Sequence, residues 1–319
     1  MKPSTAARVV QVLEQVILPY FGSNRADEIR KLDIETWLGT ASRSRSPKGR
    51  PRAPETVNGW LRLLRTLMRD AASDLEIEHD PTARVKALPA RVTRVTESRP
   101  NSLSSGEVRR FLDAAAKEPG DAYPICVVGF LTGMRFGEIS ALEWHDVDED
   151  EGLIRIRRSQ WHGKVSATKT GTPRSAALHP LIIDALRRQR RDLTERSLPV
   201  IGSGLIFPGR KGGYHRPSYL DKPLNRILKA ADIQKHLTAH GMRRTFNNLA
   251  RRAQVDRVVL HATIGHSSDA MTEHYSFVDA EEKMRAVDAV VRMVQSDQRS
   301  PNRSPDSGGG PSTEGGPQA

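Results

Sequence analysis

The chain has 319 residues, a net charge of +12 and a pI near 10.1, and this basic excess favours a polyanionic partner, nucleic acid foremost. No apolar run approaches the ~18 residues that a membrane span requires, and the amino terminus lacks the apolar stretch of a signal peptide. The single cysteine, Cys126, can form neither an internal disulfide nor a cysteine-based zinc site. These features predict a cytoplasmic protein, and a basic protein without a nucleic-acid partner remains the alternative.

The first 85 residues carry helical patterns and are expected to form one domain. Residues 1–18 predict a helix that is stopped by Pro19 followed by Gly22. Asp33 is expected to cap a second, short helix, and residues 42–54 form a basic loop. A long amphipathic helix is predicted from Pro54 onwards, with apolar residues along one face. On its opposite face lie three basic residues that suit DNA phosphates, although a merely solvated face fits equally well: Arg62, Arg65 and Arg69.

Residues 86–101 lack a sustained period and predict a linker, whereas residues 102–295 predict a second, mainly helical domain. Ser104 and Glu107 form a capping box, and residues 122–131 are apolar all round, as in a buried helix. Alternating stretches on either side of a turn at residues 162–163 predict a small antiparallel sheet, and residues 205–207 a short strand. Further helices are expected over 181–193, 218–231, 239–253, 255–264, 269–276 and 279–294. The expected fold is therefore mostly α (α+β), and residues 296–319, rich in Ser, Gly and Pro, are expected to be disordered.

Four short motifs follow one another between Thr132 and Tyr275. They are Thr132-Gly-Met-Arg135-Phe-Gly-Glu138, Thr168-Lys169-Thr170, His240-Gly-Met-Arg243-Arg-Thr-Phe246, and Ile264-Gly-His266 with Tyr275 nine residues later. This series resembles the tyrosine recombinase (phage integrase) family, in which two arginines, a hairpin lysine, two histidines and a nucleophilic tyrosine occur in this order. The resemblance covers about residues 100–290, and residues 1–85 resemble more loosely the family's helical core-binding domain. Phe277 departs from the pattern, because many members have a histidine there.

The chemistry of the two arginines can be argued from the residues themselves. A phosphodiester gains negative charge on its non-bridging oxygens during cleavage, and Arg135 and Arg243 present planar donors that stay charged. His240 lies three residues before Arg243, so a helix would place both side chains on one face, where they can meet one phosphate. The alternative is an ordinary solvent-exposed helix face. Arg244 is the competing candidate, and the spacing of the family favours Arg243. Glu138 is interpreted as a carboxylate that orients Arg135 or His240, with a surface glutamate as the alternative.

The resemblance implies roles for the remaining motif residues. Tyr275 would be the nucleophile, and its ordinary pKa near ~10 means that it needs a positive field or a neighbour such as His240 to take its proton. Lys169 would protonate the departing 5′ oxygen, with Lys164 as the second candidate, and His266 would donate a hydrogen bond to the phosphate.

No cofactor is expected. The separations among His261, His266 and His274 fit no common pair of metal ligands, and the sequence holds no phosphate-binding loop of the ATPase type. A phosphotyrosine bond conserves the energy of the broken phosphodiester, so rejoining the strands requires no nucleotide.

The resemblance implies a site-specific DNA recombinase, integrase-like, that exchanges one pair of strands at a time through a Holliday junction. Four protomers would act on two DNA sites, with or without an accessory DNA-bending factor. The alternatives are an Xer-type resolvase, a type IB topoisomerase and a catalytically silent DNA-binding regulator. A valine stripe over residues 279–294 is expected to dock on a neighbouring protomer, with packing on its own domain as the alternative. Because the sequence begins close to the core-binding region, simple recombination sites are expected.

Overall fold

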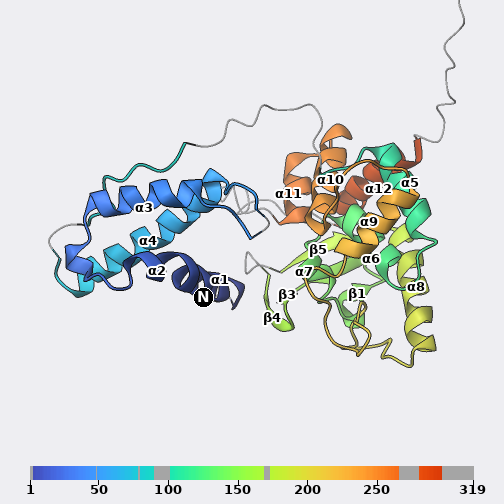
Figure 1. The fold of residues 1–319 in the computed structure, drawn as a ribbon. Helices are drawn as coiled ribbons and strands as arrows, with labels where there is room; N and C mark the ends of the chain where they lie inside the picture. The colour runs from blue at the N-terminus through green and yellow to red at the C-terminus, as the bar shows by residue number, and fades with distance from the viewer. Residues whose placement is uncertain are drawn as a thin grey trace, which may run out of the picture. The chain divides into compact units, whose positions relative to one another are not determined.

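The computed structural model describes residues 3–47, 49–77, 80–89, 101–168, 173–265 and 280–296. The chain divides into two compact units, residues 1–98 and 99–319 (Figure 1). Each unit has its own hydrophobic core. Among the described residues, no helix is long and apolar enough to cross a lipid bilayer.

The first helix of the amino-terminal unit continues past Pro19 and ends at Gly22, so of the two predicted stop signals only the glycine ends the helix. Helix α1 (Pro3–Val12) is followed by one wider π turn (Leu13–Ile17) and by α2 (Leu18–Phe21). Pro19 lies in the first turn of α2, directly after the π turn, where the hydrogen-bond pattern of the helix changes. The helix ends at Gly22, whose N–H donates to the carbonyl of Leu18 at 2.8 Å.

Helix α3 (Lys31–Arg43) is longer than predicted, and Asp33 is not its N-cap residue. Asp33 stands at the third helical position, where its carboxylate accepts the N–H of Arg30 at 2.9 Å. An acidic side chain there also suits the positive end of the helix dipole. Because α3 runs to Arg43, the expected basic loop is shorter, and within it Arg45 pairs with Pro51 in an isolated bridge.

Helix α4 (Pro54–Asp74) confirms the predicted long amphipathic helix. Arg62 and Arg69 are exposed on it, but Arg65 differs because its Nη2 donates to the carbonyl of Val85. A second contact holds the segment that follows α4. The side chain of Asn58 donates to the carbonyl of Leu88 at 2.9 Å and accepts the N–H of Leu88 at 2.8 Å. The segment through residue 89 is therefore attached to the first unit, whereas the sequence placed the start of the linker at residue 86.

The carboxy-terminal unit is built around α6 (Ala122–Thr132), which is buried along its length except at Tyr123. It packs against α5 (Ser105–Ala115), α8 (Pro180–Glu195) and α10 (Ala239–Arg252) (Figure 1). The predicted capping box at the start of α5 is confirmed: Glu107 donates its N–H to the hydroxyl of Ser104 and accepts the N–H of Ser104.

The strands form two small antiparallel sheets. Strands β1 (Val147–Asp148), β2 (Leu153–Ile156) and β5 (Arg174–Ala177) make a three-stranded sheet in the order β1-β2-β5, preceded by a 3₁₀ turn (Trp144–Asp146). Strands β3 (Arg158–Trp161) and β4 (Lys164–Ala167) form a separate hairpin. Its turn is at His162 and Gly163, as predicted, and both residues have positive φ. The strand expected over residues 205–207 is reduced to a single bridge between Glu143 and Leu205.

The remaining helices are α9 (Asp221–Ala230), α11 (Arg257–Ile264) and α12 (Ala280–Ser296). Helix α9 begins later than predicted because the preceding residues form turns, one closed by the N–H of Tyr219 on the carbonyl of Arg216 at 2.9 Å. The helix expected over residues 269–276 and the tail beyond Ser296 lie outside the described residues.

Helix α12 belongs to the core of its own unit. The valine stripe is buried against α5, α6, α10, α11 and β5, and consists of Val287, Val290, Val291 and Val294. The stripe thus follows the alternative expectation, packing on its own domain. A sequence pattern shows that a helix face is apolar but does not identify which surface covers it.

Candidate active site

A tight turn joins α6 to the short helix α7 (Phe136–Ile139) and aims Arg135. Gly133 ends α6 in the left-handed conformation at φ 63°, and an added Cβ would lie 2.7 Å from a ring carbon of Phe246. The hydroxyl of Thr132 accepts the N–H of Met134 at 3.2 Å and steadies the turn. Arg135 is thereby placed at the start of α7, and its side chain is 25% exposed.

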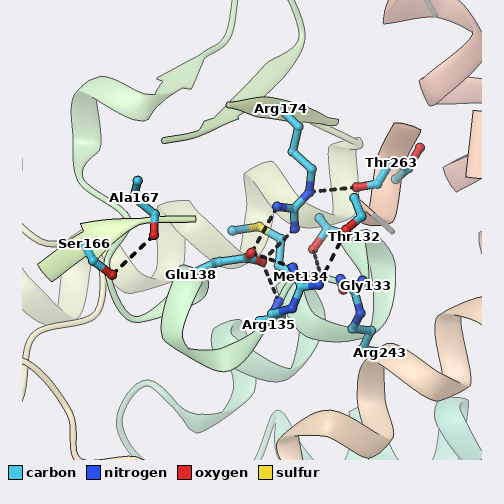
Figure 2. A network of polar contacts seen from close by, with 11 residues as sticks. Thr132, Gly133, Met134, Arg135, Glu138, Ser166, Ala167, Arg174, Arg243 and Thr263 are labelled. Carbon is cyan, nitrogen blue, oxygen red and sulfur yellow. Dashed lines mark hydrogen bonds and ion pairs between the residues drawn. The ribbon is translucent and has the colours of Figure 1, made fainter. Parts of the chain in front are cut away.

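Glu138 is the carboxylate around which the site is assembled. Its side chain is 0% exposed, and it accepts the backbone N–H of Arg135 at 2.8 Å and Nη1 of the same arginine at 3.0 Å. Arg174 approaches from β5 and donates Nη1 to Oε1 at 3.0 Å and Nη2 to Oε2 at 2.6 Å (Figure 2). Glu138 thus contacts Arg135 and is no surface glutamate.

The network of hydrogen bonds holds Glu138 in its ionised form. Burial alone raises the pKa of Glu138, but the hydrogen bonds and positive charges of Arg174 and then Arg135 outweigh this effect and hold the pKa below its ordinary value. The carboxylate therefore remains a fixed negative charge between two guanidinium groups at neutral pH.

Arg174 was not among the residues that sequence reasoning selected. It lies on the same face of β5 as the buried Ala176, because side chains alternate along a strand. A charged residue on an apolar strand face indicates a buried ion pair, and this signal was present in the sequence. The sequence did not show which residue is the partner of Arg174, because Glu138 precedes it by 36 residues.

Arg243 reaches the same cluster from α10 and is 2% exposed. Its Nη1 donates to the carbonyl of Gly133 at 2.8 Å, while its Nη2 is buried and has no hydrogen-bond partner among the described residues. Burial, and then repulsion from Arg135, lower the pKa of Arg243 to about 10, so it is still charged at neutral pH. The three arginines that face Glu138 carry more positive charge than one carboxylate can neutralise, and this excess suits an anion.

The first turn of α10 places His240 one helical turn before Arg243. The hydroxyl of Thr238 caps the helix by accepting the N–H of Gly241 at 3.1 Å, and Asn101 accepts the N–H of Thr238 at 3.1 Å. His240 is exposed at this end, where a ligand can reach it. Arg244, the competing candidate, is exposed, whereas Arg243 is buried in the cluster.

Three of the predicted site residues, Lys169, His266 and Tyr275, lie outside the described residues. Lys164, the second candidate for the general acid, is exposed at the start of β4. The structure therefore brings together Arg135, Glu138 and Arg243 of the predicted set. Within the described ranges, no three metal-ligating side chains come together.

The motif series of the second unit lies within a stretch that matches a known protein family. The model of the phage integrase family matches residues 101–282, more than half of the chain, and the chain therefore belongs to this family. Tyrosine recombinase XerC of Xanthomonas campestris pv. campestris (strain B100) is 24% identical over 217 residues, which are 67% of this chain and 62% of that protein. The integrase of Staphylococcus phage L54a is 27% identical over 153 residues, covering 44% and 43% of the two chains. The chain thus spans about three fifths of the length of the XerC relatives.

Solved structures show the same fold. The Tn1549 transposon integrase, in complex with circular intermediate DNA, matches with a TM-score of 0.65 and 20% identity, covering 90% of this chain and 93% of that one. A lambda integrase dimer bound to a COC′ core site matches with a TM-score of 0.63 and 17% identity, covering 86% and 89%. The expected mostly α fold with a small amount of antiparallel sheet is confirmed.

Proposed function

We propose that this chain is a site-specific DNA recombinase in which Tyr275 attacks a phosphodiester. The tyrosine oxygen forms a bond to phosphorus, the bond from phosphorus to the 5′ oxygen breaks, and the products are a 3′-phosphotyrosine and a 5′ hydroxyl. The 5′ hydroxyl of a partner strand reverses this step and joins the new strand.

The observation that carries the proposal is Nη2 of the buried Arg243, which has no hydrogen-bond partner in the part of the chain that the structure describes. A buried donor without a partner costs about 1–3 kcal/mol, and more when the donor is charged. Such a group is retained where a ligand supplies the missing acceptor. Arg135, partly exposed and held by Glu138, provides a second cation beside it, and a phosphodiester supplies both the acceptor oxygens and the negative charge.

Each residue of the site then has a role. Arg135 and Arg243 stabilise the charge that develops on the non-bridging oxygens, where preorganised donors contribute most. His240 shares in phosphate binding or takes the proton of Tyr275, and His266 donates to the phosphate. Lys169 protonates the leaving 5′ oxygen, with Lys164 as the second candidate. The proposal assigns no step to a metal ion or a nucleotide.

The wider partners belong to the same proposal. Lambda integrase is described as a dimer on a core site and as a tetramer on a Holliday junction, and we propose a homotetramer on two DNA sites here. The exposed Arg62 and Arg69 of α4 would contact phosphates, and Arg65 would do so only by giving up its bond to Val85. An accessory DNA-bending factor would assist where the sites need bending.

The test is a nicked DNA duplex that traps the covalent intermediate, because the short cleaved strand diffuses away and cannot be rejoined. Wild type should form an SDS-stable adduct, whereas Tyr275→Phe should bind the same DNA with an unchanged dissociation constant and form none, since it loses one oxygen and no cation. An adduct that persists in Tyr275→Phe would exclude this tyrosine as the nucleophile.

The alternatives predict other outcomes in the same assay. A wild-type chain that binds DNA and forms no adduct would be a silent regulator. An adduct together with supercoil relaxation but no exchange between sites would indicate a topoisomerase. Deletion, inversion and integration products from paired sites would separate a resolvase from an integrase.

A further inference from the structure

Arg174 makes three side-chain hydrogen bonds in the site and belongs to none of the four sequence motifs. Its side chain is 8% exposed and donates to both carboxylate oxygens of Glu138, at 3.0 and 2.6 Å. Its Nε donates to the carbonyl of Thr263 in the last turn of α11 at 3.2 Å. Figure 2 shows the guanidinium between Glu138 and Thr263, pointing to both.

The turn after α11 closes directly over this side chain. Gly265 has φ 64°, and an added Cβ would lie 3.0 Å from Cδ and 3.1 Å from Nε of Arg174. Arg135 completes the contact, because its Nη2 lies 3.5 Å from the carbonyl of Gly265. The guanidinium of Arg174 therefore links α7 to the end of α11, which leads into His266.

The charged groups that face Glu138 come from three elements. Arg135 stands at the start of the same helix, Arg174 on β5 and Arg243 on α10. Arg174 is the one that makes two side-chain hydrogen bonds to the carboxylate, so it is the main partner that compensates Glu138 for its burial. Without it, the carboxylate would take up a proton more readily and would accept fewer donors from Arg135.

We propose that Arg174 is a positioning residue for strand cleavage, holding Glu138 so that Arg135 is aimed at the phosphate and holding the end of α11 against β5. Arg174 touches no reacting atom in this scheme and acts through Glu138. The inference rests on the proposed function and assigns to the same site a residue that the motif series does not include.

The test compares single-turnover cleavage of the nicked duplex between about pH 6 and pH 9 for wild type, Arg174→Gln, Glu138→Gln and the double variant. At neutral pH, Arg174→Gln should cleave about 100-fold more slowly, the loss expected for a misplacement near 1 Å at a reacting centre. Its dissociation constant for DNA should stay within about threefold of the wild-type value, since net charge changes by one. The deficit should shrink as pH rises, because Glu138 then ionises without Arg174, and the double variant should show no such recovery.

Arg158→Gln is the matched control. Arg158 donates to Asp146, which is 1% exposed, at 2.6 Å, so its loss also breaks a buried ion pair in the same unit. This variant should melt at a lower temperature but keep the wild-type dependence of cleavage on pH. If the cleavage profile of Arg174→Gln runs parallel to that of Arg158→Gln, Arg174 is a structural residue only and the proposal is wrong.

A measurement without DNA separates this inference from the proposed function. In wild type the pKa of Glu138 lies below its unfolded value, so its ionisation stabilises the fold above about pH 4.3 and this contribution is lost as pH falls through the folded pKa. In Arg174→Gln we expect the pKa to lie above the unfolded value, so the contribution reverses and the loss of stability should be larger at pH 7 than at pH 5.

Failure of the proposed function would appear as a wild-type chain that forms no adduct, whatever the unfolding data show. An unfolding trend as expected, together with a cleavage profile of unchanged shape in Arg174→Gln, would overturn the positioning role alone. An unfolding difference that is equal at both pH values would overturn the role assigned to the ion pair with Glu138.

Discussion

At the scale of single residues, Arg243 is the least ordinary side chain of the molecule. A guanidinium that is 2% exposed, repelled by Arg135 and left with one unpartnered nitrogen among the described residues does not help the free protein to fold. Replacing buried charges with apolar groups of similar size is often neutral or stabilising, provided that no opposite charge is left buried without a partner. Glu138 keeps Arg135 and Arg174 when Arg243 is replaced. A role in phosphate binding explains why Arg243 is buried. The free protein is less stable with this charge inside, and the buried guanidinium binds a phosphate more tightly than an exposed one.

Arg243→Met should therefore separate stability from function. The free energy of unfolding, measured by urea denaturation, should stay the same or rise by about 1 kcal/mol, because the desolvated charge is removed while the volume is kept. Cleavage of the nicked duplex should fall at least about 100-fold, as is typical when one preorganised donor is lost. Inorganic phosphate should raise the melting temperature of wild type and not that of the variant.

Arg244→Met is the control, because Arg244 is the exposed neighbour on the same helix. It should leave both the cleavage rate and the response to phosphate close to those of wild type. A crippled Arg244→Met beside an active Arg243→Met would show that the second arginine of the site had been assigned one position too early.

The sequence predicted part of this cluster and missed part of it. Arg135 and Arg243 could be selected because the motifs that contain them are short and contiguous. The burial of Glu138 and the role of Arg174 depend on β5 packing next to α7, a contact between segments 36 residues apart. No local pattern specifies such a pairing, so a charged residue on an apolar face could be noticed but not connected to its partner.

At the scale of elements, the turn between α6 and α7 carries both packing and function. Gly133 adopts φ 63°, and its carbonyl accepts a hydrogen bond from Nη1 of Arg243. An added Cβ would lie 2.7 Å from Phe246 and 3.2 Å from Ile264. The same glycine therefore ends one helix, sets the direction of the next and positions an arginine from a third.

Gly133→Ala should destabilise the protein by about 3 kcal/mol, the sum of a strained backbone and a steric conflict with Phe246. Gly152→Ala is the matched control, because Gly152 has the same φ of 63° but nothing within 4 Å of an added Cβ, so it should cost only about 1 kcal/mol. Urea denaturation measures both. Equal costs would mean that the turn is not closely packed.

Helix α12 is an integral part of the second unit, which changes what its removal should do. The double variant Val287→Ala and Val291→Ala should lose about 4 kcal/mol of stability, near 2 kcal/mol for each buried valine, whereas Arg292→Ala on the exposed face should change stability by less than about 0.5 kcal/mol. Thermal unfolding checks this. A double variant that is as stable as wild type but fails to assemble on DNA would restore the idea of docking on a neighbour.

The elements that sequence predicted well are those governed by neighbouring residues. The capping box of Ser104 and Glu107 and the turn at His162 and Gly163 depend on contacts within a few positions, and both were found. The errors arose where distant contacts decide the outcome. Leu88 looked like linker because its partner, Asn58, is 30 residues away, and only the folded unit brings the two together.

At the scale of the whole molecule, the chain consists of two units with separate cores and a shared excess of positive charge. The net charge of +12 is not confined to the cluster around Glu138, since Arg62 and Arg69 are exposed on α4 of the first unit. Two units that bind one polyanion through a connecting segment gain affinity from their linkage, because the second contact forms at a high effective concentration.

The dependence of DNA binding on salt should reveal whether both units contact the same duplex. Each phosphate that is neutralised adds about 0.9 to the slope of log K against log salt concentration. The slope of the whole chain should therefore be close to the sum of the slopes of residues 1–98 and 99–319 measured separately.

Point variants of α4 test the contribution of the first unit. Arg62→Ala and Arg69→Ala should each lower the slope of the whole chain by about 1. Arg65→Ala should change the slope less and stability more, because its guanidinium is bonded to Val85. A whole chain whose slope equals that of residues 99–319 alone would show that the first unit does not bind DNA.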